Sequence, residues 1–252
     1  HVPMTTAGIA PTVIAGGATF VGAFGLFAIR RPNRRVLDAM LGAAAGVMLA
    51  ATSFSLLVPA LDGAEGWHAT WLATAFVIGA MATWGFERVL PHETAIVGDQ
   101  VPTTDASRRV TLLVAAVAIH NIPEGMAVGV GVGNDPDGAG LALAGGIMVQ
   151  NIPEGLAVAA ALAALGATRR RAVWLSSLTG VVEVVAGLIG LVVASVATAV
   201  LPTLLAGAAG AMLFVVSHEI VPETHRHGNE DTATAALVLG FAGMILLDAL
   251  VA

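Results

Sequence analysis

The stretch His120-Asn-Ile-Pro-Glu-Gly125 occurs a second time, with glutamine in place of histidine, as Gln150-Asn-Ile-Pro-Glu-Gly155. Each copy lies in the middle of a long apolar run. A carboxylate, an amide or imidazole, and a proline are each costly inside an apolar helix, so the duplicated set indicates a functional site at this depth. The two copies therefore bear on both the architecture and the place where chemistry is expected.

The composition of the whole chain is typical of a polytopic membrane protein. Hydrophobic residues make up 57% of the 252 residues, charged residues only 11%, and the mean hydropathy is +0.87. A soluble domain is rarely so apolar. Lysine and cysteine are both absent, which excludes disulfides, thiolate metal sites and a cysteine nucleophile. The few basic clusters sit in short loops, where they indicate membrane orientation rather than nucleic-acid binding.

Apolar runs of about 20 residues, the length that crosses a bilayer, occur eight times. Runs of this length predict helices, because barrel strands are shorter and alternate in polarity. We expect an all-α polytopic membrane fold with eight transmembrane helices in a single transmembrane domain over residues 1–252. The expected spans are residues 7–29, 37–59, 68–87, 110–133, 139–165, 172–196, 203–221 and 233–251.

The arginines predict the topology. All of them follow the first, third, fifth or seventh span, whereas the other loops carry acidic residues. By the positive-inside rule the arginine-bearing loops are cytoplasmic, which places both termini outside. The arginines are Arg30, Arg31, Arg34, Arg35, Arg88, Arg108, Arg109, Arg169, Arg170, Arg171 and Arg226.

The two motifs are expected at the same depth. Spans four and five cross in opposite directions, and each motif begins about halfway along its span. The first and fifth residues of a motif lie one helical turn apart and share a face: His120 with Glu124, and Gln150 with Glu154. Two antiparallel helices thus bring both motifs to the bilayer midplane.

The prolines of the motifs suggest interrupted helices. Pro123 and Pro153 each remove a backbone donor and free a carbonyl one turn earlier. Interrupted helices at the midplane are a known feature of transporter binding sites.

Span six adds a third acid, Glu183, at a similar depth. Carboxylates in a low-dielectric interior without a basic partner must take up protons or bind cations. Three acids with an imidazole and three amides predict a divalent cation site. Oxygen ligands alone suit Mg²⁺ or Ca²⁺, whereas His120 shifts the preference towards Zn²⁺, Cd²⁺, Fe²⁺ or Mn²⁺. Met48 in span two either adds a thioether ligand or fills the core.

Further polar residues form candidate paths on both sides of the midplane. An acidic loop between spans two and three can attract cations from outside, and a series of His and Glu residues follows span seven inside. The alternative for these loops is ordinary solvation. The entrance residues are Asp62, Glu65 and His68, and the release residues are His218, Glu219, Glu223, His225 and His227, with His92 and Glu93 in the loop after span three.

Together these features resemble the ZIP (Zrt/Irt-like) family of divalent metal transporters, in its bacterial branch. The resemblance rests on the two motifs in spans four and five, on Glu183 in span six, and on Ser217-His-Glu-Ile-Val-Pro-Glu-Thr-His225 at the end of span seven. It extends over the whole eight-span layout.

The resemblance implies a two-metal transport site. The first metal would be bound by His120, Glu124, Gln150 and Glu154, with Met48 as a further ligand; the second by Asn121, Asn151 and Glu183, with Glu124 and Glu154 bridging the two. The chain differs from many members of the family at Gln150, where they have His, and at Asn151, where an Asp can occur.

The resemblance also implies a fold and a mechanism. Spans 1–3 and 6–8 would be inverted repeats, with spans 4–5 as an antiparallel pair, and transport would occur by alternating access. The function expected is uptake of zinc, or of cadmium, iron or manganese, into the cytoplasm across the bacterial cytoplasmic membrane. The metal is then transported substrate, with no catalytic cofactor, and a homodimer is compatible with the family.

Two other classes of protein also place acids and histidines within a membrane. An intramembrane metallohydrolase would use His218 and Glu219, but its motif needs a second His four residues after the first, where this chain has Pro222. A proton-coupled exporter of organic cations would use the acids as proton relays, but it does not explain the imidazole and amides around them.

Overall fold

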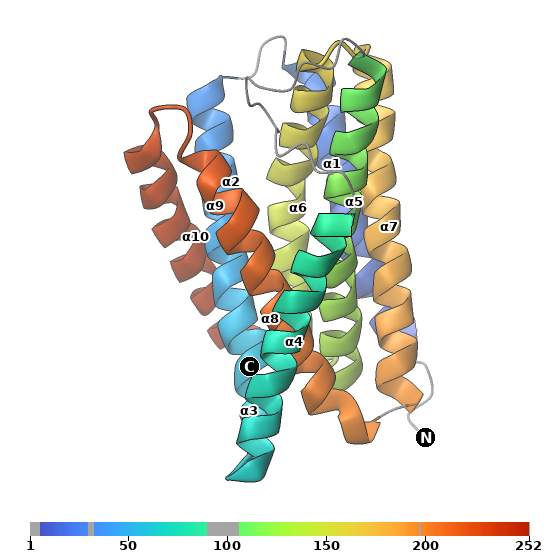
Figure 1. Cartoon of the computed structure of the whole chain (residues 1–252), viewed down its shortest axis with the longest axis vertical. Coiled ribbons are helices and arrows are strands. Elements are labelled where there is room, and N and C mark those ends of the chain that lie inside the picture. Colours follow the sequence, from blue (N-terminus) through green and yellow to red (C-terminus); the bar gives the residue numbers. More distant parts are fainter. Residues whose placement is uncertain (1–5, 30–32, 90–105, 197, 252) are drawn as a thin grey trace.

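A computed structural model describes residues 6–29, 33–89, 106–196 and 198–251, and over these ranges the chain is helical with no β-strand. Long helices alternate in direction along one axis (Figure 1). The elements are α1 (Thr6–Ala28), α2 (Arg34–Ala50), η1 (Ala51–Leu57), α3 (Val58–Leu61), α4 (Trp67–Val89), α5 (Ala106–Asn134), α6 (Ala139–Ala164), α7 (Arg169–Val196), η2 (Thr198–Val200), α8 (Leu201–Val215), η3 (Val216–Ile220), α9 (Val221–Thr224) and α10 (Glu230–Val251).

The eight predicted spans and the all-α polytopic class are confirmed. Within the described ranges, eight helical segments are long and apolar enough to cross a membrane, and their bounds agree with the expected spans to within a few residues. They are Gly8–Ala28, Arg34–Leu61, Trp67–Phe86, Leu113–Asn134, Ala139–Ala164, Arg169–Val196, Leu201–Thr224 and Glu230–Leu250.

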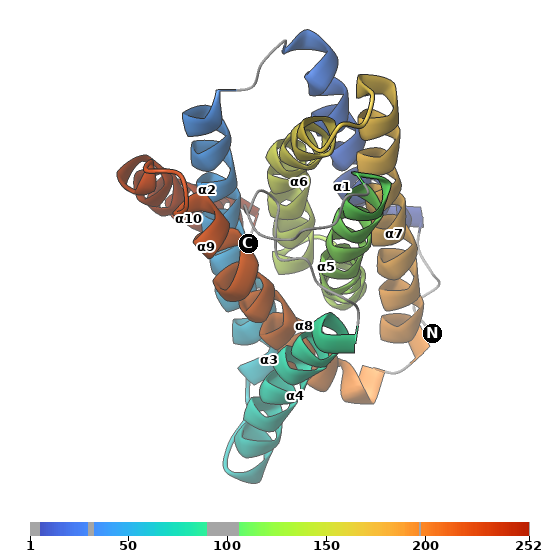
Figure 2. The ribbon, with the colours of Figure 1, turned by 45° about the horizontal axis from the view of Figure 1, so that its top comes forward.

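The helices fall into two groups (Figure 2). We call α1, α5, α6 and α7 the motif bundle, because α5 and α6 carry the two motifs and pack against α7 and α1. The flanking helices are α2, α4, α8 and α10, where α2 packs on α10 and α4 on α8. The two groups meet mainly where α2 contacts α6 and α8 contacts α5.

The glycine that ends each motif lets the motif bundle pack closely. A Cβ at Gly125 would collide with the backbone carbonyl of Glu183 on α7, and a Cβ at Gly155 with that of Thr19 on α1. Small residues allow such close contact between membrane helices. The contact at Gly125 also brings the backbone that carries Glu183 alongside the first motif.

The expected interruption at the motif prolines is not found. Helices α5 and α6 continue through Pro123 and Pro153. Instead, the flanking helices widen into π-helical turns, η1 and η3, shortly before Pro59 and Pro222. A proline removes one hydrogen bond, but packing decides whether the helix around it changes its winding, and π-turns often occur at functional sites.

Buried apolar side chains form two clusters, one on each side of the motifs. The first includes Leu41 and Val117 and lies towards the end where α2 begins. The second includes Met48, Val128 and Ile147, on the opposite side of the motifs along the same helices. The polar residues of the motifs therefore lie in a layer between two apolar layers.

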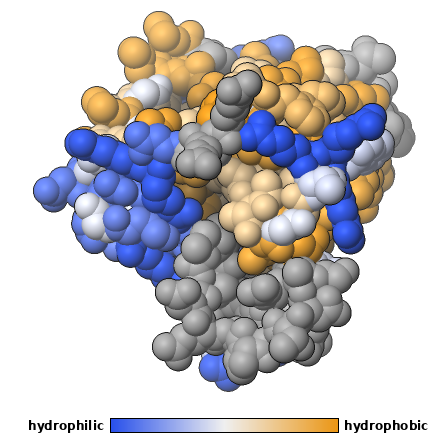
Figure 3. Space-filling view, turned by 90° about the horizontal axis from the view of Figure 1, so that it is seen from above, coloured by the Kyte–Doolittle hydropathy of each residue, from blue (hydrophilic) through white to orange (hydrophobic). Residues whose placement is uncertain are grey.

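The two ends of the molecule differ in polarity. Arg34, Arg88 and Arg226 all lie at helix ends on one side, which we call the arginine end. Seen from that end, hydrophilic residues gather beside hydrophobic helix surfaces (Figure 3). The guanidinium of Arg88 lies 4.2 Å from the ring centre of Trp84, and such a tryptophan near a helix end is typical of a membrane interface.

Candidate metal centre

Five of the predicted ligands are buried together in the layer between the two apolar clusters. The exposed fraction is 8% for His120 and 1% for Glu124 on α5, 1% for Gln150 and 0% for Asn151 on α6, and 1% for Glu183 on α7. Glu154, on α6, is partly buried. Polar groups at this depth are retained only where they have hydrogen bonds or bind a ligand.

Glu219, predicted as a release residue, contacts the first motif. Its Oε1 lies 2.6 Å from His120 Nε2, so an acid from η3 of the flanking helices contacts the imidazole of the first motif. The π-helical turn inserts an extra residue relative to α-helical winding and thereby changes which side chains face the motif bundle. A fourth carboxylate thus joins the three that the sequence places at the midplane.

The two amides of the second motif hold the carboxylates in a hydrogen-bonded chain. Gln150 Nε2 donates to Glu124 Oε2 at 3.0 Å and to Asn151 Oδ1 at 2.9 Å. Asn151 Nδ2 donates to both oxygens of Glu183, each at 2.8 Å, and to the backbone oxygen of Ala15, also at 2.8 Å. The amides donate hydrogen bonds to the acids, but as neutral groups they do not compensate the negative charge of the acids.

Several buried oxygen atoms of the centre lack a hydrogen-bond partner within the described part of the chain. They are Gln150 Oε1, Glu154 Oε2 and the amide oxygen of Asn121, whose amide nitrogen is also unpaired. Because buried polar atoms are nearly always hydrogen-bonded, these oxygens are positions at which a bound ion or an ordered water would bond. Carboxylate and carboxamide oxygens are ligands for divalent cations.

A cavity of about 50 Å³ extends from the centre towards the arginine end. Apolar residues such as Leu41 and Val117 form part of its wall. Its volume exceeds that of one water molecule in the liquid. The polar residues that line it are His120, Glu124, Gln150, Glu154, Glu219 and Glu223.

The side chains of the centre do not surround a single point. Among the described residues, no three His, Asp or Glu side chains stand close enough together to hold one ion. The acids of the centre would have to close around a metal, which the amide of Gln150 can assist by turning its free oxygen towards the ion. The donor set therefore fits a divalent metal, with an adjustment of side chains on binding.

Four predicted ligands are not among the described residues that line the cavity: Met48, Asn121, Asn151 and Glu183. Met48 is fully buried within the second apolar cluster and is not among the described residues that line the cavity. Asn121 is fully buried but also lies outside this lining. Their roles as ligands stay predictions.

The predicted entrance residues lie at the end opposite the arginines. Asp62, Glu65 and His68 are exposed around the connection between α3 and α4, apart from the cavity.

The sequence did not predict the hydrogen bond from Ser55 to Asp248 Oδ1, 3.1 Å long, which joins η1 to α10. Two segments so far apart in the sequence show no local pattern that predicts their contact.

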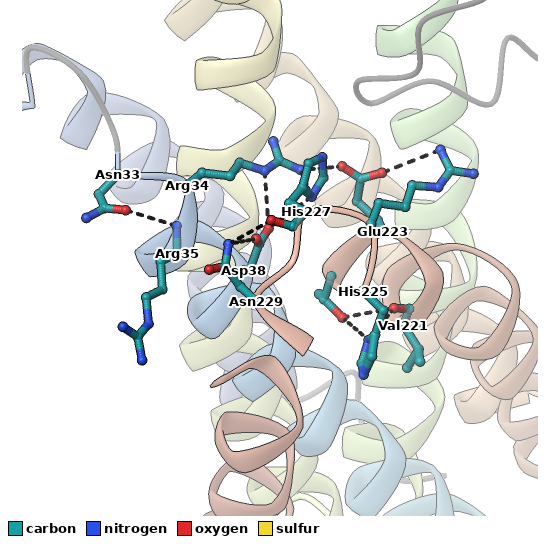
Figure 4. A network of polar contacts seen from close by, with 11 residues as sticks. Asn33, Arg34, Arg35, Asp38, Val221, Glu223, His225, His227 and Asn229 are labelled. Carbon is teal, nitrogen blue, oxygen red and sulfur yellow. Dashed lines mark hydrogen bonds and ion pairs between the residues drawn. The ribbon is translucent and has the colours of Figure 1, made fainter. Parts of the chain in front are cut away.

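The predicted release residues have different surroundings, and their role in release stays a prediction. Glu223 is buried and lines the cavity, whereas His218 is exposed and stacks on Phe214 with ring centres 4.9 Å apart. His225 caps its own segment by contacting Val221 O, and His227 belongs to a cluster with Glu223 (Figure 4). His92 and Glu93 lie outside the described residues.

Sequence analysis also missed Arg34 and Asp38, which join Glu223 and His227 in that cluster. Asp38 is fully buried at the start of α2, with Arg34 one turn before it. The only signal in the sequence is an oppositely charged pair four residues apart near the start of an apolar span, a spacing typical of any exposed helix.

The sequence pattern of a family described as ZIP zinc transporter matches residues 91–248. Zinc transporter ZIPB of Bordetella bronchiseptica is 43% identical over 237 residues, which cover 92% of this chain and 77% of that protein. Zinc transporter GufA of Myxococcus xanthus is 39% identical over 248 residues, 96% of this chain and 98% of its own length. Zinc transporter ZIP11 of Homo sapiens is 32% identical, covering 94% of this chain and 95% of its own length.

Proposed function

The chain belongs to the ZIP zinc transporter family, and on that basis we propose that it carries divalent transition-metal ions, zinc first among them, into the cytoplasm. Membership of this family makes it a transporter rather than an enzyme. Cadmium, iron and manganese are further candidate substrates because imidazole and carboxylate together suit all of these ions. The metal is cargo, bound and released in each cycle, and the whole chain acts as one transmembrane domain.

One observation carries this proposal: four buried or partly buried acids lie in the same layer as one imidazole, at a depth where the spans contain no arginine or lysine. Glu124, Glu154, Glu183 and Glu219 supply the negative charge, and every arginine of the chain lies at or beyond a span end. Amide donors alone do not neutralise this charge. A divalent cation would compensate two of the acids and bond to the orphaned oxygens.

We assign the ligands to two neighbouring positions. The first consists of His120, Glu124, Gln150 and Glu154, with Met48 as a further ligand after a local shift. The second consists of Asn121, Asn151 and Glu183, with Glu124 and Glu154 shared. The hydrogen-bonded chain from Glu124 through Gln150 and Asn151 to Glu183 supports their proximity.

Transport is proposed to occur by alternating access between inverted repeats. Under such a repeat α1 corresponds to α7, α5 to α6, α2 to α8 and α4 to α10. The main packing pairs exchange accordingly: α5 with α7 corresponds to α6 with α1, and α2 with α10 corresponds to α8 with α4. The π-turns η1 and η3 are exchanged in the same way. The motif bundle would move against the flanking helices and carry the metal past the apolar layers.

We place the arginine end in the cytoplasm and both termini outside, by the positive-inside rule. The cavity then joins the centre to the cytoplasmic side and the second apolar cluster separates it from the outside. The location proposed is the bacterial cytoplasmic membrane, with lipid around the exposed apolar helix faces. A homodimer stays a prediction of the family resemblance.

The proposal is tested by reconstituting the purified chain into vesicles that contain a zinc-sensitive dye. Zinc should enter these vesicles, while Glu154→Gln, which keeps the shape of the side chain but not its charge, should reduce entry to that of empty vesicles. Glu230→Gln is the matched control, because Glu230 is an exposed acid in the first turn of α10.

Parallel assays separate the rival classes. Peptide cleavage or export of an organic dye without zinc entry would contradict the proposal. The orientation in the vesicles can be read with an impermeant maleimide, because the chain has no cysteine. A cysteine at Ala64 and one at Ala167 should be labelled from opposite sides.

A further inference from the structure

Glu223, which lines the cavity, belongs to a cluster of charged residues that the transport site does not use (Figure 4). Arg34 Nη2 lies 2.6 Å from Glu223 Oε1 and 2.8 Å from His227 Nδ1. Arg34 Nε lies 3.2 Å from Asp38 Oδ1. Asn229 Nδ2 donates to the other oxygen of Asp38 at 2.9 Å. One guanidinium thus binds side chains from α2, α9 and the loop before α10.

The three partners of Arg34 contact it in different ways. Glu223 Oε1 accepts a hydrogen bond from Nη2, whereas Asp38 Oδ1 forms an ion pair with Nε. A guanidinium has donors only, so its contact with His227 Nδ1 is a hydrogen bond in the tautomer that leaves this nitrogen unprotonated. The same nitrogen lies 3.5 Å from Asp38 Oδ1. Two carboxylates and the unprotonated nitrogen of an imidazole form a typical donor set for a divalent transition metal. In this structure that donor set surrounds an arginine.

Burial makes a cation necessary at this place. Asp38 is fully buried and Glu223 is 5% exposed, whereas about a third of the Arg34 side chain is exposed. Two desolvated acids without a cation would carry a large energetic cost. Arg226 is 3.9 Å from Glu223 but is nearly half exposed, so Arg34 supplies most of the compensation.

Glu223 connects this cluster to the transport path. It lines the cavity that contains His120, Glu124 and Glu154, and it also forms the shortest contact of Arg34. A metal ion that leaves the centre along the cavity therefore reaches a carboxylate that Arg34 already occupies. The ion and the guanidinium are two cations that compete for the same oxygen.

We propose that Arg34 is a tethered cation that occupies a metal-release site formed by Asp38, Glu223 and His227, and that a departing metal displaces it. The inference rests on the proposed function. With Arg34 in place the acids are compensated, and the contact between α2 and α9 closes the cavity. When a divalent ion arrives, Arg34 swings into the solvent and the three side chains close on the ion. The return of Arg34 then expels the ion into the cytoplasm.

The charge of Arg34 can be tested without changing the fold between samples. Arg34→Cys gives the chain a single cysteine, and one preparation can be divided and labelled with a cationic aminoethyl or a neutral methyl methanethiosulfonate. Zinc is then titrated into both detergent-solubilised samples. The neutral sample should bind one more zinc per chain than the cationic sample, and adding Glu223→Gln should remove the difference.

Equal zinc stoichiometry in the two labelled samples would overturn the proposal. A merely structural role of Arg34 predicts that equality, because both labels share one unlabelled parent. If Arg34→Cys does not fold, His227→Ala tests the release site in a chain that keeps Arg34. It should slow zinc entry into vesicles severalfold without weakening zinc binding at the centre, and unchanged entry would contradict the release site. If wild-type protein neither binds nor transports zinc, the proposed function fails instead.

Discussion

The metal centre and the Arg34 cluster are both built from buried acids and histidine, yet they compensate charge differently. At the Arg34 cluster, a guanidinium lies 2.6 Å from Glu223 and 3.2 Å from Asp38. At the centre, the hydrogen bonds to Glu124 and Glu183 come from the neutral amides of Gln150 and Asn151. The cluster carries its own cation, whereas these hydrogen bonds bring no positive charge to the acids of the centre, where we propose that the transported metal binds.

This difference has a simple physical basis. Taking a carboxylate out of water is costly unless it is both hydrogen-bonded and charge-compensated. Amide donors provide the hydrogen bonds but no net charge, so they keep the acids of the centre in position while leaving them able to bind a cation. An arginine there would compensate the acids as Arg34 compensates Asp38 and Glu223, and it would compete with the cargo for them.

The largest effect is expected at the shared acid of the centre. Glu124→Ala should lower zinc entry by at least about 100-fold. Removing a residue that only hydrogen-bonds to a metal ligand typically lowers metal affinity or activity by less than this. It removes a charge from both proposed metal positions at once. Membrane insertion should persist, because deleting a buried acid makes the span more apolar. Vesicle uptake and detergent gel filtration measure the two outcomes, with Asp231→Ala as a surface control.

His120→Ala should have the next largest effect. It removes the only imidazole of the centre and leaves Glu219, 2.6 Å away, without this partner. Zinc affinity measured by chelator competition should fall about 10–100-fold, with a smaller loss for manganese, which depends less on nitrogen ligands. An equal loss for both ions would argue that His120 has a structural role instead of binding the metal.

A moderate effect on transport is expected at the Arg34 cluster. Asp38→Ala removes the ion pair with Arg34 and the carboxylate that accepts a hydrogen bond from Asn229, so the protein should lose about 1.5–3 kcal/mol of stability, the typical value for hydrogen bonds to a charged group. Zinc entry should fall only severalfold, because the centre stays intact. Thermal unfolding in detergent gives the first number and vesicle uptake the second. Complete loss of uptake in a folded Asp38→Ala protein would remove the distinction between the two regions.

The smallest effect on transport is expected for Glu183→Gln. Gln keeps the shape of the side chain, but it removes the charge that belongs to the second metal position alone. The variant should bind one fewer metal per chain and still transport at an altered rate. Wild-type stoichiometry in a metal titration would show that Glu183 does not belong to a second position.

Much of the fold could be predicted from the sequence because a membrane imposes strong rules. Each span needs about 20 apolar residues, and the expected spans agree with the eight found among the described residues. The burial of His120, Glu124 and Gln150 at one depth also followed, since their positions along two antiparallel helices set their height. Their role as ligands stays a prediction.

The contacts between distant segments could not be predicted. Glu219 reaches His120 through the π-helical turn η3, and hydropathy does not report a change of helical winding. Arg34 and Glu223 are 189 residues apart, so no periodic pattern connects them. The prolines of the motifs predicted interrupted helices, and this prediction was wrong for a related reason. The winding changes before Pro59 and Pro222 instead, in the flanking helices, whose packing differs from that of the motif bundle.

Anomalous diffraction from crystals grown with zinc would test most directly whether the proposed metal centre binds the cargo. A zinc peak should lie within bonding distance of His120, Glu124 and Glu154, and a second peak close to Glu183 would complete the two-metal assignment. At the Arg34 cluster the wild-type protein should show no peak while Arg34 contacts Glu223. Zinc bound only at surface histidines, with none between α5 and α6, would contradict the transport site.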